Sequence, residues 1–274
     1  MIKLVAIDLD GTLLNGKKEI SPKNKAAIAK AKAQGVKVVI CTGRPLSAIH
    51  PFLSELNLEE AGDYSVTFNG GLVQCNDTGE IIEKNNLRFE DLKTLIQLAQ
   101  ALDLPLDILS EEKVYHLPTS ETNQSLYATM NPLLTHFSVG LDELDPERIY
   151  NKAVIGFDQV FLDQQIKKIP EDIREQFEVI KSRDMLLEFM PQGVTKAYGL
   201  SLLARDLGLE PANVMGIGDE ENDLSMIAYA GIGVAMANAT AEVKAAADVQ
   251  TASNEEDGVA LAIEKYVLNE RLTI

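Results

Sequence analysis

The sequence predicts an α/β fold in which a doubly wound parallel sheet forms a core and an α+β domain is inserted into that core. Short apolar runs alternate with helical patterns towards both ends of the chain, which is typical of a parallel α/β sheet. Three of these runs end directly in polar residues, where such sheets bind ligands. The pattern changes between the two ends, so we predict a core of residues 1–84 and 190–274 and an inserted domain of residues 85–189.

The composition is that of a globular enzyme. The chain has 274 residues, enough to bury a large core in one or two domains, with 46% hydrophobic and 24% charged residues. No stretch approaches the roughly 18 consecutive apolar residues of a membrane span. The first apolar run is too short for a secretory signal, and acidic residues follow it directly. We therefore expect a cytoplasmic protein that does not bind a membrane.

The charge and the cysteine count exclude several kinds of site. The formal net charge of -17 argues against a nucleic acid as partner, because such binding rests on clustered Lys and Arg. A phosphate pocket would have to reverse this charge locally with metal, Lys and Arg. Cys41 and Cys75 support neither a disulfide framework nor a multi-cysteine zinc site. Because His50, His116 and His136 lie without ligand spacing, we expect no histidine site.

The first element is a buried strand over residues 4–7, since an apolar run without alternation fits a strand covered on both faces. It breaks into Asp8 and Asp10, two carboxylates that would point roughly to one side. Their mutual repulsion favours a hard divalent cation such as Mg²⁺. Gly11 permits a turn, and Thr12 with neighbouring amides can donate to an anion.

A second buried strand over residues 36–41 ends in Thr42, Gly43 and Arg44. Ser21 marks the start of the helix that precedes it. The predicted elements of this half of the core are strands over residues 4–7, 36–41 and 65–68, helices over residues 23–34 and 46–56, and a hairpin that runs from Asn69 and Gly70 to residue 84.

The inserted domain combines short strands with helical periodicity, which predicts an antiparallel sheet with helices. Its predicted strands cover residues 106–109, 113–117, 152–157, 177–181 and 185–189, and its predicted helices cover residues 90–102, a polar stretch from Ser120, and residues 159–169.

The core pattern then returns. A strand over residues 214–217 runs into Gly218, Asp219, Asn222 and Asp223, again polar residues at a strand end. The other predicted elements are helices over residues 195–207, 241–247 and 258–268, a helix ending at residue 230, and strands over residues 232–234 and 249–251.

Four motifs taken together resemble the haloacid dehalogenase superfamily of phosphohydrolases. They are Asp-x-Asp-Gly-Thr-Leu from Asp8, Thr-Gly-Arg from Thr42, the single Lys196, and Gly-Asp-x-x-Asn-Asp from Gly218. The resemblance runs from end to end of the chain, and the insert looks like the class IIB cap of the Cof-type branch. It implies a Mg²⁺-dependent phosphatase with a movable cap.

The resemblance also assigns roles to residues. Asp8 would be the nucleophile, Asp10 the general acid and base, and Thr42 and Lys196 would contact the transferring phosphoryl group. Asp10 would bind the metal through its main-chain carbonyl, whereas Asp223 would act through water or orient its neighbours. The catalytic residues are thus Asp8, Asp10, Thr42 and Lys196, the substrate-binding residues are Gly43, Arg44, Asn69, Gly70 and Asn222, and the metal ligands are Asp8, Asp10, Asp219 and Asp223.

Some of these roles stay open at the level of the sequence. Arg44 would either reach the substrate or brace its loop, and Asn69 with Gly70 would form either a substrate-side loop or an ordinary turn. The chain has Ala197 where the family commonly places Gly after the lysine, so the distance of this loop from the substrate could differ.

The expected function is hydrolysis of small phosphorylated metabolites, with sugar phosphates first, through an aspartyl-phosphate. A phosphomutase is the alternative reaction, and flavin or pyridoxal phosphates are alternative substrates. A metabolite-binding module without activity would require the loss of a motif residue, and all are present. The chain would work as a monomer or a homodimer.

Overall fold

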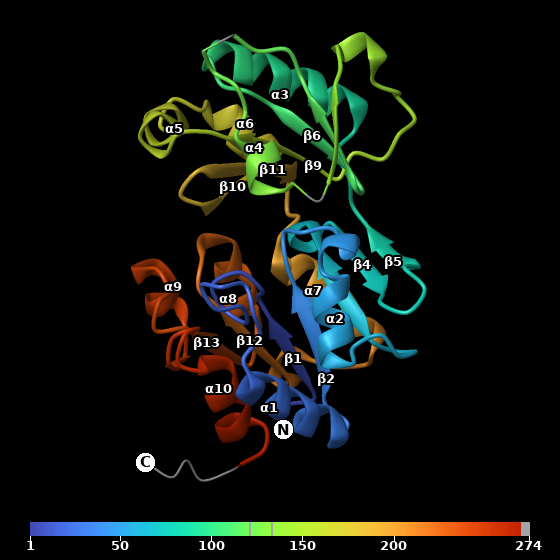
Figure 1. Cartoon of the computed structure of the whole chain (residues 1–274), viewed down its shortest axis with the longest axis vertical. Coiled ribbons are helices and arrows are strands. Elements are labelled where there is room, and N and C mark those ends of the chain that lie inside the picture. Colours follow the sequence, from blue (N-terminus) through green and yellow to red (C-terminus); the bar gives the residue numbers. More distant parts are fainter. Residues whose placement is uncertain (121, 133, 270–274) are drawn as a thin grey trace. The chain divides into compact units, whose positions relative to one another are not determined.

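The computed structural model describes residues 1–120, 122–132 and 134–269. It divides into two compact units, one made of Met1–Lys84 with the chain from Thr195 onward, and one made of Asn85–Val194 (Figure 1). The first boundary lies after Lys84, as the sequence suggested. The second lies after Val194 rather than after residue 189, because strand β11 (Leu186–Pro191) and the turn that follows it belong to the inserted unit. We call the two units the core and the cap.

The core contains one sheet with strand order β14-β13-β12-β1-β2-β3-β4-β5. The strands from β14 to β3 are mutually parallel, whereas β4 and β5 extend the sheet in antiparallel fashion. The predicted doubly wound α/β core is therefore confirmed. Its strands are β1 (Leu4–Ile7), β2 (Lys37–Cys41), β3 (Tyr64–Thr67), β4 (Leu72–Cys75), β5 (Ile81–Lys84), β12 (Val214–Gly218), β13 (Ile232–Ala235) and β14 (Val249–Gln250).

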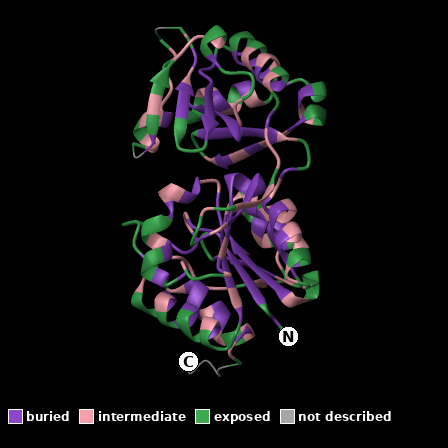
Figure 2. Cartoon of the chain, turned by 90° about the vertical axis from the view of Figure 1, so that its right-hand side faces the viewer, coloured by how far each residue is buried: buried purple, intermediate pink, exposed green. Residues whose placement is uncertain are grey.

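Helices cover both faces of the core sheet. On one face, α1 (Pro22–Ala33), α2 (His50–Leu56), α9 (Ala241–Ala246) and α10 (Gly258–Tyr266) share a buried apolar cluster with the strands. On the other face, α7 (Lys196–Asp206) and α8 (Leu224–Tyr229) form a second cluster. Figure 2 shows the buried strands between helices whose outer sides are exposed.

Side-chain caps start the two helices that flank the motif strands. The Ser21 hydroxyl accepts a hydrogen bond from the Asn24 amide at 3.1 Å, with Pro22 in the first turn of α1. Thr195 caps α7 in the same way, accepting from the Tyr198 amide at 3.3 Å. This cap places Lys196 at the first helical position.

The cap contains a six-stranded sheet in the order β10-β11-β9-β6-β7-β8. Its pairs are antiparallel except for β7 and β8, which are parallel, so the prediction of an antiparallel sheet was correct for all but this edge. The strands besides β11 are β6 (Asp107–Ser110), β7 (Lys113–His116), β8 (Thr135–Ser138), β9 (Lys152–Gly156) and β10 (Phe177–Arg183). Sequence reasoning missed β8, which has only half-buried and exposed residues and no apolar run.

One face of the cap sheet packs against helices. These are α3 (Phe89–Ala101), α5 (Gln159–Ile166) and α6 (Glu171–Gln176), which share a single apolar cluster with the sheet. The sheet residues in this cluster point towards the helices. Because side chains alternate along a strand, the residues next to them in sequence point to the opposite face. Those neighbours include the polar residues Asp107, His116, Lys152 and Glu188.

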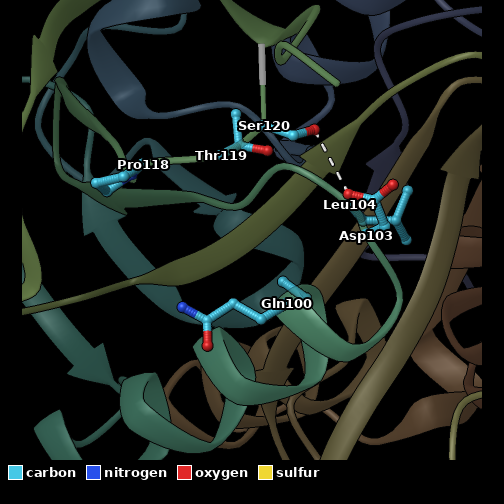
Figure 3. A pocket seen from close by; sticks show the side chains of 7 residues that line it. Gln100, Asp103, Leu104, Pro118, Thr119 and Ser120 are labelled. Carbon is cyan, nitrogen blue, oxygen red and sulfur yellow. Dashed lines mark hydrogen bonds between the residues drawn. The ribbon is translucent and has the colours of Figure 1, made fainter. Parts of the chain in front are cut away.

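The polar helix predicted from Ser120 is wrong for the described residues. The chain forms turns there, and a short helix α4 (Tyr127–Met130) follows. Side-chain hydrogen bonds compete with a helical backbone: the Asn123 amide donates to the Asp103 carbonyl at 2.6 Å, and the Gln124 amide to the Ser120 carbonyl at 3.0 Å. Figure 3 shows the hydrogen bond between Ser120 and Asp103. Both residues line a cavity of about 290 Å³. None of the helices in the described ranges has the length and apolar character that crossing a membrane requires.

Candidate active site

Three neighbouring parallel strands deliver the predicted motif residues to one edge of the core sheet. Strand β1 lies between β12 and β2, with Ile7 in register with both Ile217 and Ile40. Asp8 follows β1 and donates its amide to the Ile217 carbonyl at 3.0 Å, which continues the pairing of the two strands. Because parallel strands end at the same edge, the residues that follow β1, β2 and β12 meet there.

Lys196 joins two of these strand ends. Its ammonium donates to Asp8 Oδ1 at 2.5 Å and to Asp223 Oδ1 at 2.6 Å, and all three side chains are buried. The two charges raise the pKa of Lys196 above its ordinary value, although burial alone would lower it. The lysine is therefore a permanent cation between the two carboxylates.

The turn after β3 lies directly against the start of α7. A Cβ on Gly70 would lie 1.9 Å from the Thr195 carbonyl oxygen, and the backbone of Gly70 has a φ of +100°. Only glycine fits this position without a shift of the backbone. Gly70 thus has a structural reason to be glycine: it lets Lys196 approach the strand ends closely.

The carboxylates of the site are held in an unfavourable environment. Burial raises the pKa of Asp8 to about 7, and repulsion from Asp223 adds to this effect while Lys196 opposes it. Burial likewise raises the pKa of Asp219 to about 8, with repulsion from Asp8 and Asp223. Three buried carboxylates therefore face a single ammonium, and the cluster favours an additional positive charge.

Two side chains fix the carboxylate of Asp219. The Thr12 hydroxyl donates to Oδ1 at 2.6 Å, and the Asn238 amide donates to Oδ2 at 3.3 Å. The sequence suggested that Thr12 donates to an anion, and the anion is this carboxylate. Sequence reasoning missed Asn238. It lies shortly after β13, the strand next to β12, so it too follows a parallel strand at the ligand-binding edge of the sheet.

Asp223 is occupied by donors on both oxygens. Besides the bond of Oδ1 to Lys196, its Oδ2 accepts from the amides of Asp219 at 2.9 Å and Glu220 at 3.0 Å. A Cβ on Gly218 would lie 2.4 Å from this side chain. Asp223 therefore shapes the loop after β12 and anchors Lys196.

Asp10 faces a different set of partners. Arg44 donates from Nε to Oδ2 at 2.8 Å and from Nη2 to Oδ1 at 2.7 Å, and Lys18 donates to Oδ1 at 2.8 Å. The Thr42 hydroxyl accepts from the Arg44 amide at 3.2 Å, which shapes the loop after β2. Arg44 thus braces the loop carrying the expected acid. Sequence reasoning did not find Lys18, whose position in an exposed turn gives no signal.

A rim of small and amide residues completes the site. The Asn222 amide donates to Asn69 Oδ1 at 3.0 Å, and the Asn69 main-chain amide donates to the Thr42 carbonyl at 3.0 Å. Gly43 leaves room for Asn69, because a Cβ there would lie 3.1 Å from its Oδ1. Within the described residues, Nδ2 of the fully buried Asn69 finds no acceptor. Hydrogen bonds therefore join these residues from three loops into one layer that holds a buried donor.

The donor set fits a hard divalent cation. Asp8, Asp219 and Asp223 each offer an oxygen, and these atoms lie within 4.8 Å of one another. Oxygen ligands and an excess of negative charge are what Mg²⁺ requires. Asp223 already accepts from the Lys196 ammonium and from two main-chain amides, whereas Asp219, among the described residues, accepts only from a neutral hydroxyl and a neutral side-chain amide. Asp219, together with Asp8, is therefore better placed as a direct ligand.

Comparisons with known proteins agree with this geometry. A family model of haloacid dehalogenase-like hydrolases matches residues 5–263. A candidate phosphatase of Bacillus subtilis, YxeH, is 41% identical over 272 residues, which cover 98% of this chain and 99% of that protein. The 5-amino-6-(5-phospho-D-ribitylamino)uracil phosphatase YcsE of the same organism is 33% identical over 97% of this chain and 96% of its own length.

A solved structure shares the whole architecture. The subclass IIB sugar phosphatase BT4131 superimposes with a TM-score of 0.81 at 27% identity, covering 96% of this chain and 98% of that one. A likeness of four sequence segments (residues 2–14, 42–45, 213–234 and 257–269) to the bacterial sugar phosphatase YidA stays a prediction. The matched family model and the full-length relatives show that the chain belongs to the haloacid dehalogenase-like hydrolases and is a phosphatase of that family.

Proposed function

We propose that this protein is a Mg²⁺-dependent phosphatase that hydrolyses small phosphorylated metabolites, sugar phosphates first, through an aspartyl-phosphate. The observation that carries the proposal is the buried cluster in which Lys196 bridges Asp8 and Asp223 while Asp219 lies close by. A cluster with more carboxylates than cations is suited to a metal and a phosphoryl group, not to structural stability.

The hydrogen bond that Asp8 accepts from Lys196 supports its role as the nucleophile. Lys196 restrains Oδ1, so Oδ2 is the oxygen that would attack phosphorus. Attack forms an Asp8 O–P bond and breaks the bond between phosphorus and the ester oxygen of the substrate. Lys196 would also neutralise charge on the transferring group. Mg²⁺, held by Asp8, Asp219 and the main-chain carbonyl of Asp10, would supply further neutralisation.

Asp10 would complete both half-reactions. As an acid it gives a proton to the departing alkoxide, and as a carboxylate it takes one from the water that attacks the intermediate, which releases phosphate and restores Asp8. In the structure Arg44 and Lys18 bind this carboxylate. An incoming phosphoryl group would compete for Arg44 and free Asp10 to act.

The substrate class rests on the relatives and on the rim. BT4131 is a sugar phosphatase by name. Nδ2 of Asn69 has no acceptor among the described residues and is buried, so it would donate to a phosphoryl or hydroxyl oxygen once the loops around it open. YcsE gives a second candidate, a phosphorylated ribitylamino compound, because that is the substrate in its name. Both classes carry a phosphate on a polyhydroxylated carbon chain.

Phosphate release from a panel of substrates tests the proposal. The panel contains sugar phosphates, a ribityl phosphate, flavin mononucleotide, pyridoxal phosphate and nucleotides, each with and without Mg²⁺. We expect Mg²⁺-dependent release that is fastest with a sugar phosphate. Isomerised sugar phosphate without free phosphate would instead indicate a phosphomutase, and no turnover of any compound by folded protein would overturn the proposal.

A further inference from the structure

Asn238 connects three loops of the core through a single side chain. It lies after β13 and donates from Nδ2 to the Gly11 carbonyl at 2.8 Å and to Asp219 Oδ2 at 3.3 Å. Its Oδ1 accepts from the amide of Asn254 at 3.1 Å. The nitrogen and the oxygen of this side-chain amide are thus both hydrogen-bonded, to partners on the segments that follow β1, β12 and β14.

The contact with Asp219 lies where the loops are packed most closely. A Cβ on Gly11 would lie 2.3 Å from Asp219 Oδ2, so the carboxylate and the loop after β1 already touch. With Thr12 on Oδ1, the Asn238 amide on Oδ2 leaves the carboxylate little freedom to rotate. Hydrogen bonds of this kind to a ligating carboxylate tune its orientation and its affinity for metal.

We propose that Asn238 is a positioning residue that orients Asp219 for Mg²⁺, an inference that rests on the proposed function. Asn254 provides a natural comparison. Its side chain donates to the Leu14 carbonyl at 2.9 Å and holds the same loop, yet only its main chain contacts Asn238. Loss of the Asn254 side chain therefore loosens the loop after β1. It leaves intact the Asn238 side-chain amide, which restrains Asp219.

Calorimetric titration of Mg²⁺ into wild type, Asn238→Ala and Asn254→Ala tests this role. We expect Asn238→Ala to bind Mg²⁺ about 10-fold to 100-fold more weakly and Asn254→Ala to bind like wild type. Thermal unfolding without Mg²⁺ reports whether each variant is folded. If Asn238→Ala does not fold, Asn238→Ser replaces it, because a shorter hydroxyl cannot reach all three partners.

Two results would overturn the inference: equal Mg²⁺ affinity in wild type and Asn238→Ala, or an equal loss in Asn254→Ala. Asp219→Asn separates the inference from the proposed function, since it removes the carboxylate itself. If Asp219→Asn and wild type bind Mg²⁺ equally, the proposed metal site has failed, and the role of Asn238 with it.

A second observation, independent of the first, concerns two histidines in the cap. His116 Nδ1 lies 2.6 Å from Asp107 Oδ1, and His116 Nε2 lies 2.8 Å from His136 Nδ1. His136 Nε2 in turn lies 3.0 Å from the Asn131 carbonyl oxygen, at the end of α4. The two rings are nearly parallel, with 9° between their planes. The spacing of the histidines in the sequence did not indicate that two of them are in contact.

A count of protons shows why the pair is unusual. Each of the three contacts is a hydrogen bond only if one proton lies between its two atoms, and the Asn131 carbonyl can only accept. Two neutral imidazoles carry one proton each. The third proton must therefore be bound as well, which gives the histidine pair one positive charge opposite the buried Asp107 carboxylate.

The surroundings favour this proton. The hydrogen bond to Asp107 raises the pKa of His116. The Ser125 hydroxyl donates to the other Asp107 oxygen. Tyr127 lies nearby, at the start of α4. Glu143 and His116 line the same cavity, which has a volume of about 410 Å³. Among these neighbours the acidic groups are Asp107 and Glu143, and both favour a cation.

We infer that Asp107, His116 and His136 form a proton-binding site that ties β8 to the end of α4 only while the histidine pair holds its extra proton. Loss of that proton leaves two lone pairs facing one another at one contact, and that contact must open.

Nitrogen-15 NMR of the imidazole rings as a function of pH tests the inference. We expect the His116 ring to lose its extra proton at a pH above the roughly 6.5 of a free histidine, and Asp107→Asn to lower that pH. The main-chain amide signals of β6 and β9, both in the cap, show whether the cap of a variant is folded. Should Asp107→Asn not fold, Ser125→Ala is used, which we expect to raise the apparent pKa because the carboxylate loses a donor. A proton loss from His116 at the pH of a free histidine, unchanged in the variants, would overturn the inference.

Discussion

Arg44 binds both carboxylate oxygens of Asp10, with Nε 2.8 Å from Oδ2 and Nη2 2.7 Å from Oδ1. Such a two-point contact fixes the plane of the carboxylate as well as its distance. Asp10 is the expected acid and base, so the residue that holds it in the free protein also controls when it becomes available. This relationship leads to the first prediction.

Arg44→Lys should impair turnover although it keeps the charge, because an ammonium can make a two-point contact neither with Asp10 in the free protein nor with the phosphoryl group that would replace Asp10. We expect kcat/KM to fall about 10-fold, the equivalent of about 1.4 kcal/mol. Lys18→Ala is the matched control, since it removes the more exposed contact with Asp10 and should cost less than about 1 kcal/mol. Equal losses in the two variants would show that Asp10 needs only nearby positive charge.

Lys196→Ala should strongly destabilise the protein in the absence of metal. The substitution leaves the buried carboxylates of Asp8 and Asp223 without their cation, and breaking such a pair costs about 3–5 kcal/mol. Urea unfolding measures the loss. Lys23→Ala, which removes an exposed contact with Glu264 at 3.9 Å, is the control and should change the free energy of unfolding by less than about 1 kcal/mol. A small effect in Lys196→Ala would mean that the carboxylates are protonated without it.

The stability of the metal-free protein should fall as the pH rises through the neutral range. The pKa values of Asp8 and Asp219 are raised to about 7 and about 8, so the folded protein holds protons there that the unfolded chain has released. Their contribution is complete below the ordinary carboxylate pKa and is lost as the pH rises through these values. Mg²⁺ replaces the protons, so the rise in Tm on adding Mg²⁺ should be larger near pH 8.5 than near pH 5.5.

Asp219→Asn is the control for this pH dependence, because it removes one of the two titrating groups. Its Tm without Mg²⁺ should vary less with pH over the same range. A Mg²⁺ effect that is independent of pH would contradict the assignment of the raised pKa values to the metal ligands.

Gly70→Ala should disrupt the site from a distance. The new Cβ would collide with the Thr195 carbonyl at 1.9 Å in a backbone of positive φ, and the turn and α7 would have to separate. Gly35→Ala isolates the backbone term, because Gly35 also has a positive φ, of +81°, but nothing lies within 4 Å of its Cβ. We expect Gly35→Ala to cost about 1–2 kcal/mol and Gly70→Ala clearly more, with loss of activity as Lys196 moves. Equal costs in the two variants would contradict the close packing.

Much of the fold and the centre of the site are predictable from the sequence, for a physical reason. Uninterrupted apolar runs such as residues 4–7 need cover on both faces, and polar residues that end such strands meet at one edge. Asp8, Thr42 and Asp219 obey this rule, and the structure brings them together. The role of each residue came from the family resemblance.

The missed features depend on partners far away in the chain. Asn238 contacts Gly11 across 227 positions, and no local pattern marks such a pair. His116 and His136 meet through β8, a half-exposed edge strand without an apolar run. The sequence predicted a helix from Ser120, whereas the described residues form turns. Helix propensity does not account for the side-chain hydrogen bonds to the Asp103 and Ser120 carbonyls that stabilise these turns.

The central claim is that Asp8 is the nucleophile of a metal-dependent phosphatase. Phosphate release from the best sugar phosphate, measured in Mg²⁺ for wild type and Asp8→Asn at equal protein concentration, tests it most directly. We predict rapid release by wild type and release at the background level by the variant, with both proteins folded. Release by Asp8→Asn at a rate close to that of wild type would contradict the account, because the reaction would then need no carboxylate at this position.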